Sequence, residues 1–351
     1  MFHPLRVSSV EELTDDSVAV TLDVPPELRE IFRHTPGQHL ALRRTAGGEE
    51  IRRTYSICSP AAPPGRDPVL RIGIRLVEGG EFSTYALKEL TAGATVEAMA
   101  PMGRFRLEPR PGYFAAIVGG SGITPVLSMA ATLLEREPKA RFCLIRSDRT
   151  VASTMFLDEV ADLKDRYPDR FQLITALSRE ERQSGLPTGR LDQERLTGLL
   201  PAVLTLAEVD GWFLCGPFGL VTGADRALRE LGVDRSRIHQ EIFHVDDGSS
   251  PAPAPVRAPA HASLTATLAG RSGSWPVREG ESLLETVLRS RSDAPYACKG
   301  GVCGTCRAFL VSGEVRMDRN YALEPEETGA GYVLACQSHP ATAEVELDFD
   351  R

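Results

Sequence analysis

The sequence predicts a multidomain protein: an antiparallel β-barrel, an α/β domain with a parallel sheet, and a separate C-terminal domain. Three observations predict this order. Short strand patterns with turn signals fill residues 1–110, and strand and helix patterns then alternate from Gly112 to about Leu231. A proline–alanine run at 251–260 sets off the rest. A chain of 351 residues is long enough for two or three domains with separate cores.

The barrel is predicted from alternating apolar and polar residues, a pattern typical of half-buried strands. Strands are expected at Val18–Val24, Leu70–Val77 and Thr95–Met99. Paired turn residues separate the strand patterns: Pro36-Gly37, Gly47-Gly48 and Gly79-Gly80. Short strands with regular turns favour an all-β barrel.

The α/β domain is predicted from a change of pattern after Gly112. Apolar strand runs are expected at Phe114–Val118, Arg141–Arg146, Phe171–Thr175 and Trp212–Cys215. Helices are expected between them at Ile123–Glu135, Met155–Asp165 and Leu220–Leu231. Strands that alternate with helices indicate a parallel sheet, and right-handed crossovers place helices on both of its faces.

Residues 246–262 are predicted to form a linker. Asp246–Ser250 leads into alternating Pro and Ala, which favours extended polyproline II and a semi-rigid spacer. Residues 263–351 are therefore expected to be a tethered module. This module has thirteen acidic against nine basic residues, a net charge of −4. Either it prefers a partner with a basic docking face, or the charge only keeps it in solution.

Bulk composition excludes some functions. The net charge of −8 gives no electrostatic support for nucleic-acid binding. No long apolar run and no apolar signal segment is visible, so we expect no membrane association and a cytoplasmic location.

Four cysteines near the C-terminus carry the strongest signal. Cys298, Cys303, Cys306 and Cys336 have the spacing C-x4-C-x2-C…C, which is typical of plant-type [2Fe–2S] ligation by thiolates. Zinc usually takes two short Cys or Cys/His pairs, and disulfides are rare in the cytosol. We therefore expect a cluster that moves single electrons. The remaining cysteines are expected to be reduced core residues: Cys58, Cys143 and Cys215.

Two glycine-containing turns in the α/β domain are candidate nucleotide contacts. Gly119–Pro125 lies between a strand and a helix, where glycines permit close approach of a pyrophosphate to unpaired N–H groups. Cys215-Gly216-Pro217 ends a later strand at its carboxyl end, where ligands bind in such sheets. A plain tight turn and a helix-initiating turn remain the alternatives.

A third candidate lies in the β half, at Arg53-Thr54-Tyr55-Ser56. Arginine can bind phosphate with two hydrogen bonds, tyrosine can stack on a flat ring, and a serine hydroxyl can bond a ring nitrogen. An ordinary strand with outward polar groups explains the same residues.

Taken in order, these motifs resemble those of the ferredoxin–NADP reductase superfamily: R-x-Y-S for the flavin, the two turns for the nicotinamide nucleotide, and a C-terminal plant-type ferredoxin domain. Within that superfamily, the chain resembles the reductase subunits of phenylacetyl-CoA epoxidases. The segments that carry this similarity are Arg53–Cys58, Val77–Ser83, Pro295–Cys303, Asn320–Pro325 and Gly331–Gln337.

The resemblance implies an FAD-binding barrel at 1–110, an NAD(P)-binding α/β domain at 111–245 and an α+β (β-grasp) ferredoxin domain at 263–351. Arg53 would hold the FAD pyrophosphate, while Tyr55 would lie against the flavin ring and Ser56 near its reactive nitrogen. Further flavin contacts would come from Ile74, Leu76, Gly80, Phe82, Ser83 and Phe243, with Glu241 beside the last. A β-hairpin turn and a core strand are the alternative for residues 74–83.

For the nicotinamide nucleotide, the resemblance implies contacts from Gly119, Gly120, Ser121, Gly122, Thr124, Pro125, Ser147, Arg149, Cys215, Gly216 and Pro217. Arg149, with help from Arg179, favours a 2′-phosphate and hence NADPH, whereas Asp148 can hold a free 2′-hydroxyl and leaves NADH possible. The family usually has Asn at the position of Asp148. Charges that only solvate a loop remain an alternative.

The implied function is electron transfer from NADPH through FAD and the [2Fe–2S] cluster to a diiron oxygenase component of a multicomponent monooxygenase. One alternative is a similar reductase for another ring-hydroxylating or ketosteroid oxygenase. The other is a redox sensor or binding module with a vestigial flavin domain; the motif around Arg53 and the glycine turn argue against it.

Overall fold

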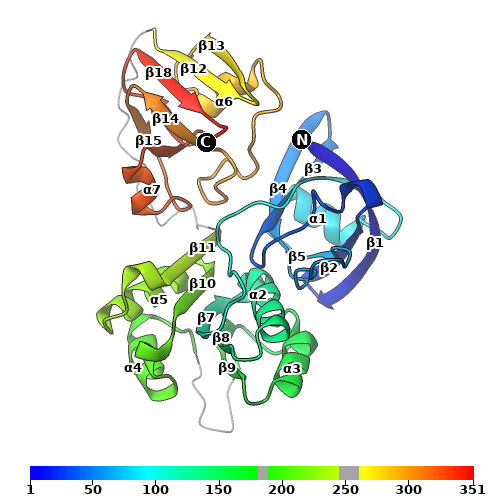
Figure 1. Cartoon of the computed structure of the whole chain (residues 1–351). Helices are drawn as coiled ribbons and strands as arrows, with labels where there is room; N and C mark the ends of the chain where they lie inside the picture. The colour runs from blue at the N-terminus through cyan, green and yellow to red at the C-terminus, as the bar shows by residue number, and fades with distance from the viewer. Residues whose placement is uncertain (181–188, 245–260) are drawn as a thin grey trace. The chain divides into compact units, whose positions relative to one another are not determined.

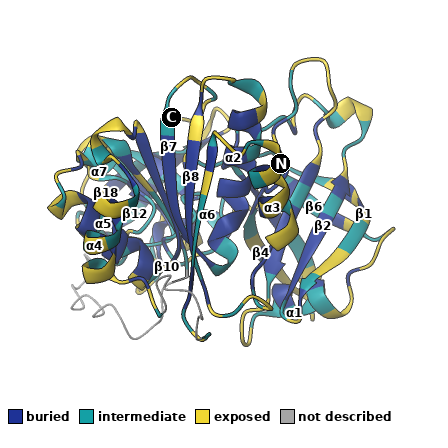
Figure 2. Ribbon diagram, turned by 90° about the horizontal axis from the view of Figure 1, so that it is seen from below, coloured by how far each residue is buried: buried dark blue, intermediate teal, exposed yellow. Residues whose placement is uncertain are grey.

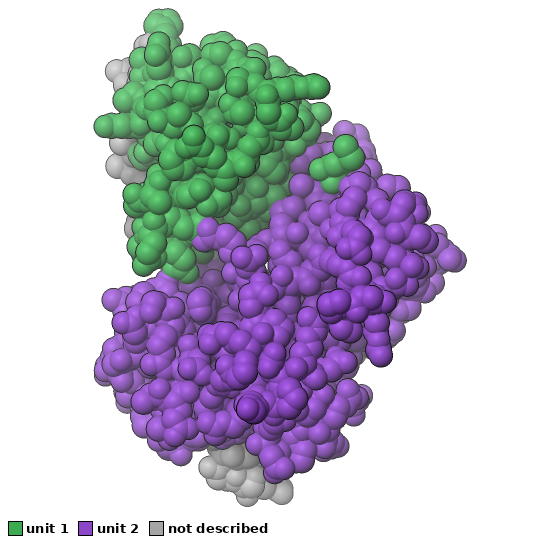
Figure 3. All heavy atoms as spheres, in the orientation of Figure 1, with its two compact units in different colours: residues 1, 245–351 green, residues 2–244 purple. Residues whose placement is uncertain are grey.

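The computed structural model describes residues 1–180, 189–244 and 261–351. The chain divides into two compact units, residues 2–244 and residues 245–351 with Met1, which Figure 3 colours separately. Most of the predicted linker, 246–262, lies outside the described residues, so its conformation stays a prediction. The domain boundaries predicted from the sequence likewise remain predictions.

The first part of the larger unit is an antiparallel sheet of six strands, ordered β4-β3-β6-β1-β2-β5. These strands are β1 Phe2–Thr14, β2 Ser17–Asp23, β3 His39–Ala46, β4 Glu49–Ser56, β5 Leu70–Arg75 and β6 Thr95–Met99. The two outermost strands meet where a bridge joins Ile57, just after β4, to Ile72 of β5, and the sheet thereby curls into the predicted barrel (Figure 1).

The expectation that this part contains only strands was wrong at one place. The helix α1, Glu81–Lys88, follows the Gly79-Gly80 turn. Phe82 and Ala86, four residues apart, face the barrel core and are at most 1% exposed. The short stretch carries only two turns of apolar periodicity, so packing on the barrel rather than propensity decides the helix.

The second part of the larger unit is a parallel sheet of five strands, ordered β11-β10-β7-β8-β9. Its strands are β7 Tyr113–Gly119, β8 Arg141–Asp148, β9 Phe171–Leu177, β10 Gly211–Pro217 and β11 Ile238–His244. Its helices are α2 Ile123–Arg136, α3 Leu157–Arg166, α4 Gln193–Val203 and α5 Phe218–Glu230, with α2 and α3 on one face and α4 and α5 on the other (Figure 1). The strand order reverses between β7 and β10, which makes the gap between their carboxyl ends a topological switch point.

Burial follows strand type. Strands β7, β8 and β10 are buried along nearly their whole length, as expected for strands covered on both faces (Figure 2). Strand β1 mixes exposed, half-buried and a few buried residues without a regular alternation. This difference explains why the continuous apolar runs predicted the parallel strands well, whereas the irregular pattern of β1 gave no strand prediction.

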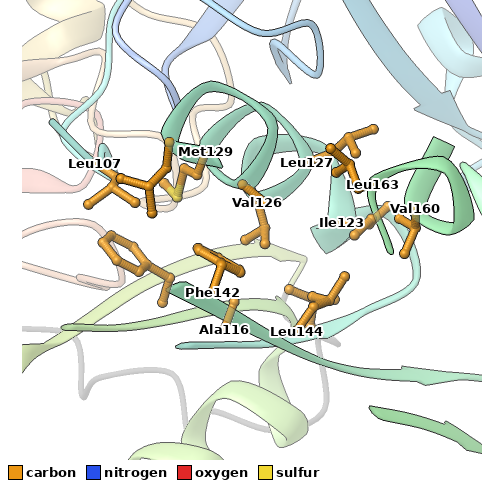
Figure 4. Packing of buried hydrophobic residues seen from close by; sticks show 14 of the residues in the cluster. Leu107, Ala116, Ile123, Val126, Leu127, Met129, Phe142, Leu144, Val160 and Leu163 are labelled. Carbon is orange, nitrogen blue, oxygen red and sulfur yellow. The ribbon is translucent and has the colours of Figure 1, made fainter. Parts of the chain in front are cut away.

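One hydrophobic core joins the barrel to the parallel sheet. Side chains of α2 such as Val126 and Met129 pack on Phe142 of β8 and on Leu107, which precedes β7 (Figure 4). Ala19 and Cys58 of the barrel belong to the same cluster. Residues 2–244 are therefore one packed body.

The smaller unit has a mixed sheet of five strands, ordered β13-β12-β18-β14-β16, and a pair β15-β17. The elements are β12 Ser263–Leu268, β13 Arg271–Pro276, α6 Leu283–Leu288, β14 Arg307–Ser312, β15 Val315–Met317, α7 Pro325–Gly329, β16 Tyr332–Leu334, β17 Ser338–Pro340 and β18 Glu344–Asp348. Leu283, Leu284 and Val287 of α6 pack on the sheet, whose strands β12 and β18 are parallel. This arrangement confirms the predicted α+β fold.

Candidate flavin, nucleotide and cluster sites

Strand β4 presents the predicted flavin motif on a fixed surface. Arg53 is exposed, and its Nη1 donates to the Arg52 carbonyl at 2.7 Å. The Tyr55 ring lies 5.5 Å from the Phe82 ring, and burial raises the pKa of the Tyr55 hydroxyl. Ser56 is buried. Tyr55 and Arg53 share one face of the strand because successive side chains alternate.

The neighbouring arginine has a different role. Arg52 is 4% exposed, its Nη2 pairs with Glu50 at 2.8 Å, and its guanidinium lies 4.8 Å from the Phe2 ring centre. Its charge is therefore neutralised on the barrel. Of these two adjacent arginines, only Arg53 presents its side chain to solvent, as an anion-binding residue must.

The second predicted flavin segment, residues 74–83, offers a flavin its backbone more than its side chains. Ile74 and Phe82 are fully buried in the barrel core, while Leu76 is 41% exposed. The Ser83 hydroxyl donates to the Gly80 carbonyl at 3.1 Å and accepts from the Val77 N–H at 3.1 Å, which shapes the turn. Gly80 is the N-cap of α1 and supplies no side-chain cap.

These features fit a flavin nucleotide. The uncapped first turn of α1 leaves N–H groups for a phosphate, and Arg53 is an exposed cation on the same barrel. Tyr55 lies beside Phe82 of α1, and the exposed Leu76 offers an apolar surface just before the helix. Whether each residue touches FAD stays a prediction.

Three polar side chains far apart in the sequence meet at the end of β4. The Ser56 hydroxyl donates to Glu241 Oε2 on β11 at the long distance of 3.4 Å, and His39 Nδ1 on β3 lies 3.9 Å from Glu241 Oε1. Burial raises the pKa of Glu241 to about 8 and lowers the pKa of His39 to about 4. Near neutral pH the group therefore holds one dissociable proton and no net charge.

The sequence alone missed His39, and it named Glu241 only through the resemblance. Phe243, two residues further along β11, is half-buried and packs against the shared core. Its predicted contact with the flavin edge stays a prediction. No sequence signal marks His39, because its proximity to Glu241 depends on the meeting of β3 and β11.

The two glycine-containing turns of the α/β domain touch each other at the switch point. A Cβ on Gly122 would collide with the Cys215 carbonyl, and one on Gly119 would lie 2.8 Å from Leu220 Cδ2. Gly216 has a φ of 142°, and a Cβ there would lie 2.9 Å from the Gly119 nitrogen. Glycine is therefore required here for close backbone packing, which the sequence interpretation attributed to a pyrophosphate.

The turn still fits a dinucleotide. The α2 N-cap, Gly122, has no side-chain cap, and although the Ile123 N–H donates to the carbonyls of Gly120 and Ser121, this end of the helix still presents its positive dipole to a phosphate. Thr124 Oγ1 donates to the Ser121 carbonyl at 2.9 Å and steadies the turn, and Pro125 is buried in the first helical turn. The four residues Gly119–Gly122 and the Cys215–Pro217 turn line the same switch point.

The two residues that could select between NADPH and NADH, Asp148 and Arg149, have different environments at the end of β8. Asp148 is 5% exposed, and its Oδ2 accepts from Nε of the buried Arg146 at 2.8 Å. Arg149 is exposed, and its carbonyl accepts from the N–H of Arg179, which is also exposed. Ser147, half-buried, ends the pairing of β8 with β7. The carboxylate thus turns inward while both guanidiniums face solvent.

Left-handed backbone shapes the cysteine loop. Lys299, Gly301 and Gly304 have φ values of 51°, 78° and 67°. The Gly300 N–H donates to Cys298 Sγ at 3.3 Å. The loop is therefore tight, and a backbone N–H reaches a cysteine sulfur.

The four cysteine sulfurs are arranged as two pairs. Cys303 hydrogen-bonds to Cys298, and this bond, with N–H groups of the loop, lowers the pKa of Cys298 to about 5. Cys306 hydrogen-bonds to Cys336 and lowers its pKa in the same way. Among the described residues, no three ligating side chains converge on one point as they would around a single ion. Two pairs of sulfurs suit a cluster of two irons, each held by two thiolates.

Three family models match the chain in succession: an oxidoreductase FAD-binding domain at residues 4–107, an oxidoreductase NAD-binding domain at 116–226 and a 2Fe-2S iron-sulfur cluster binding domain at 266–341. The chain is 42% identical over 353 residues to a subunit of the 1,2-phenylacetyl-CoA epoxidase of Escherichia coli K12, covering 99% of this chain and 98% of that protein. The chain belongs to the FAD- and NAD-binding reductases with a C-terminal [2Fe–2S] domain. It is an NAD(P)H-dependent flavin and iron–sulfur oxidoreductase, and its cofactors are FAD, NAD(P)H and a [2Fe–2S] cluster.

Other members of this reductase family are also similar over the whole chain. The ferredoxin reductase component of 3-ketosteroid-9-alpha-monooxygenase from Rhodococcus rhodochrous is 32% identical, covering 98% of this chain and 96% of that protein. The structure of phthalate dioxygenase reductase, described as modular for electron transfer from pyridine nucleotides to [2Fe–2S], matches with a TM-score of 0.61 at 24% identity. That match covers 99% of this chain and 98% of the other and supports the fold. No helix in the described ranges is long and apolar enough to span a bilayer.

Proposed function

We propose that this reductase is the NADPH-dependent electron-transfer component of a multicomponent diiron monooxygenase, with phenylacetyl-CoA epoxidase as the partner system. The full-length similarity to one subunit of that system, at 42% identity, carries the choice of partner. The proposed electron route runs from NADPH to FAD, to the [2Fe–2S] cluster and then to the oxygenase.

When bound, FAD and the cluster supply the redox chemistry, because FAD takes two electrons as hydride and the cluster takes one electron at a time. The chain supplies binding and orientation. Arg53 and the first turn of α1 would hold the FAD phosphates, and Tyr55 would lie along the flavin ring. Tyr55 keeps its proton, because burial raises its pKa.

Ser56 and Glu241 are the polar groups that the chain supplies at this site. Glu241 is protonated near neutral pH, so it can give up a proton, and the Ser56 hydroxyl would donate a hydrogen bond to the carboxylate that remains. The balanced oxidation of NADPH to NADP⁺ releases two electrons and one proton, and a buried group with a pKa of about 8 suits a transient proton acceptor or donor.

For the nucleotide, the end of β8 supports NADPH. The Asp148 carboxylate is occupied by Arg146 and turned away from solvent, which removes the residue that would favour a free ribose hydroxyl. Arg149 and Arg179 are exposed on adjacent strand ends and would pair with a 2′-phosphate.

For the cluster, each sulfur pair would hold one iron: Cys298 with Cys303, and Cys306 with Cys336. The loop contributes N–H groups such as that of Gly300, which stabilise negative charge on sulfur. The other three cysteines, Cys58, Cys143 and Cys215, are buried and form no disulfide, which suits the reducing cytoplasm that we propose as its location.

A ketosteroid or other ring-hydroxylating oxygenase is the second candidate partner. The 32% identity to the 3-ketosteroid-9-alpha-monooxygenase reductase over nearly the whole length favours it as the alternative. Both candidates require the same reductase chemistry, so only the partner distinguishes them.

An anaerobic titration with NADPH, and separately with NADH, tests the proposal. We expect NADPH to bleach the flavin absorbance at lower concentration than NADH, and a reduced [2Fe–2S] signal to follow in electron paramagnetic resonance. Turnover is then measured with a phenylacetyl-CoA epoxidase oxygenase component and with a ketosteroid oxygenase. Flavin that bleaches without a cluster signal would contradict the route, and turnover with only the ketosteroid oxygenase would contradict the partner.

A further inference from the structure

The outward face of β5 carries a recess lined by small residues. Gly73 pairs directly with Ala19 on β2, and both are buried. Side chains from the α/β part fill the recess: a Cβ on Gly73 would lie 2.7 Å from Thr124 Cγ2 and 2.8 Å from Phe156 Cε2. Because real Cβ atoms do not approach so closely, only glycine fits here while both side chains stay in place.

Charged contacts flank the recess on both sides. Arg71 and Arg75 share the outward face of β5 with Gly73, since side chains alternate along a strand. Arg71 pairs with Glu159 of α3 at 2.8 Å, and its guanidinium carbon lies 5.3 Å from the Phe156 ring centre. Arg75 Nη2 donates to the Ser153 carbonyl at 2.6 Å. Three successive outward positions of one barrel strand therefore hold the segment that follows β8.

The backbone at Phe156 is specialised for this contact. Phe156 has φ 55° and ψ 39° at the N-cap of α3, a left-handed conformation that is rare for a bulky residue. Such a conformation persists only where the surroundings determine it strongly. The ring is 1% exposed, so it has no surface left for a ligand. Phe156 can therefore affect a bound ligand only through the residues packed around its ring.

Those neighbours belong to the proposed nucleotide site. Thr124 lies in the first turn of α2 and bonds the Ser121 carbonyl of the glycine turn. Ser153 closes a short turn with Thr150, whose N–H donates to Ser153 Oγ at 3.1 Å, directly after Arg149. The Phe156 ring thus shares the recess on the flavin-barrel strand with Thr124 of one nucleotide segment, and Phe156 itself ends the other segment.

We propose that Phe156 is a positioning residue for electron transfer from the nicotinamide nucleotide. Its ring, seated on Ala19 and Gly73, fixes the α2 turn and the segment after β8 at one setting relative to the flavin strands. The inference rests on the proposed function, because it takes those segments as the NADPH site. Reactions between two bound groups are sensitive to small displacements, so a residue placed in this way acts on rate more than on binding.

Filling the recess tests the proposal. In Gly73→Ala the added methyl must displace Phe156 or Thr124, and Phe156→Leu in the same chain removes the ring atoms that it meets. Gly198→Ala in α4 is the matched control, since nothing lies within 4 Å of its added methyl. The readouts are FAD content, thermal midpoint, the rate of flavin bleaching by NADPH, and the long-wavelength charge-transfer absorbance of the nicotinamide–flavin complex.

We expect Gly73→Ala to retain FAD and to keep a thermal midpoint near that of Gly198→Ala. Its rate of flavin bleaching by NADPH should fall by about tenfold or more, and its charge-transfer absorbance should be lost. The double variant should recover both in part and exceed Phe156→Leu alone, because the added methyl fills space that the ring leaves. Unchanged bleaching and absorbance in Gly73→Ala would overturn the proposal. So would slow bleaching that accompanies loss of FAD and is not recovered in the double variant, since that result indicates packing alone.

If Gly73→Ala does not fold, the single variant Phe156→Leu tests the proposal. We expect its kcat to fall while the KM for NADPH changes less than about twofold, because the ring contacts no nucleotide. A change confined to KM, or no change, would overturn the proposal. Failure of the unmodified reductase to retain FAD or oxidise NADPH would instead refute the proposed function.

Discussion

The cysteine loop and the flavin–nucleotide region achieve their chemistry in different ways. Three of the four proposed cluster cysteines lie within Cys298–Cys306, and left-handed residues of that same loop set their geometry. In the larger unit, Ser56, His39 and Glu241 come from three strands, and the altered pKa values of His39 and Glu241 exist only once those strands meet. Chemistry encoded in one loop is visible in sequence, whereas chemistry assembled across a fold is not.

Glycine illustrates the same difference. Gly301 and Gly304 in the cysteine loop are required for positive φ, a local property. Gly122 and Gly119 are required because the backbone of β10 and a side chain of α5 occupy the space of a Cβ. The first requirement can be predicted from a loop sequence, and the second requires the partner strand.

The largest expected effect is on the local site. Cys303→Ser removes one thiolate of the Cys298 pair, so the cluster should be lost and electron delivery to an oxygenase abolished. Flavin bleaching by NADPH should stay within about twofold of the unmodified rate, because distant sites behave independently. Electron paramagnetic resonance measures the cluster, and stopped-flow absorbance measures the rate of flavin bleaching. Cys143→Ala, in the core of β8, is the control, and oxygenase turnover in Cys303→Ser would contradict the cluster route.

The next largest effect concerns the close backbone packing between the two glycine-containing turns. Gly122→Ala places a methyl against the Cys215 carbonyl, and overpacking against backbone should cost about 3 kcal/mol of unfolding free energy. Urea denaturation followed by far-ultraviolet circular dichroism measures the loss. Gly219→Ala in α5 adds the same methyl in open space and should be near neutral. Equal stability of the two variants would show that the turn adjusts and that close packing is not its requirement.

The pH dependence of stability tests Glu241. Its folded pKa of about 8 lies above the ordinary value of 4.5, so the folded state binds this proton more tightly than the unfolded chain. The contribution of this proton to the free energy of unfolding is therefore fully present below pH 4.5, and it is lost as the pH rises toward 8. Glu241→Gln removes this dependence and should gain about 2 kcal/mol on the unmodified protein between about pH 5 and pH 8, after allowance for a side chain that is 14% exposed.

His39 acts in the opposite direction. Its folded pKa of about 4 lies below the ordinary value of 6.5, so its contribution is present above pH 6.5 and is lost as the pH falls toward 4. Both proteins retain His39, so the difference between their urea-unfolding free energies isolates Glu241. Parallel curves across this pH range would mean that Glu241 is ionised in the folded protein.

The smallest expected effect concerns nucleotide choice. Arg149→Ala should raise the KM for NADPH about tenfold and leave that for NADH nearly unchanged, equivalent to about 1.4 kcal/mol for one phosphate contact. Arg141→Ala is the control, since Arg141 is exposed at the other end of β8 and pairs with Glu208. Equal changes for both nucleotides would remove Arg149 from 2′-phosphate recognition.

Much of the fold could be predicted because its signals are periodic. The expected strand Phe114–Val118 and helix Ile123–Glu135 correspond to β7 and α2 almost residue for residue. The helix α1 was missed because its eight residues become helical by packing Phe82 into the barrel. Strand β11 was missed because its sequence mixes polar and apolar residues, and pairing with β10 decides it.

By itself, the sequence determined the order of domains and predicted the thiolate ligands and the flavin and nucleotide motifs, because each depends on residues close together in the chain. Only the tertiary structure paired Asp148 with Arg146, brought His39 to Glu241 and seated Phe156 on Gly73. These contacts join residues from different elements, and both burial energies and pKa shifts depend on which groups are brought together out of water.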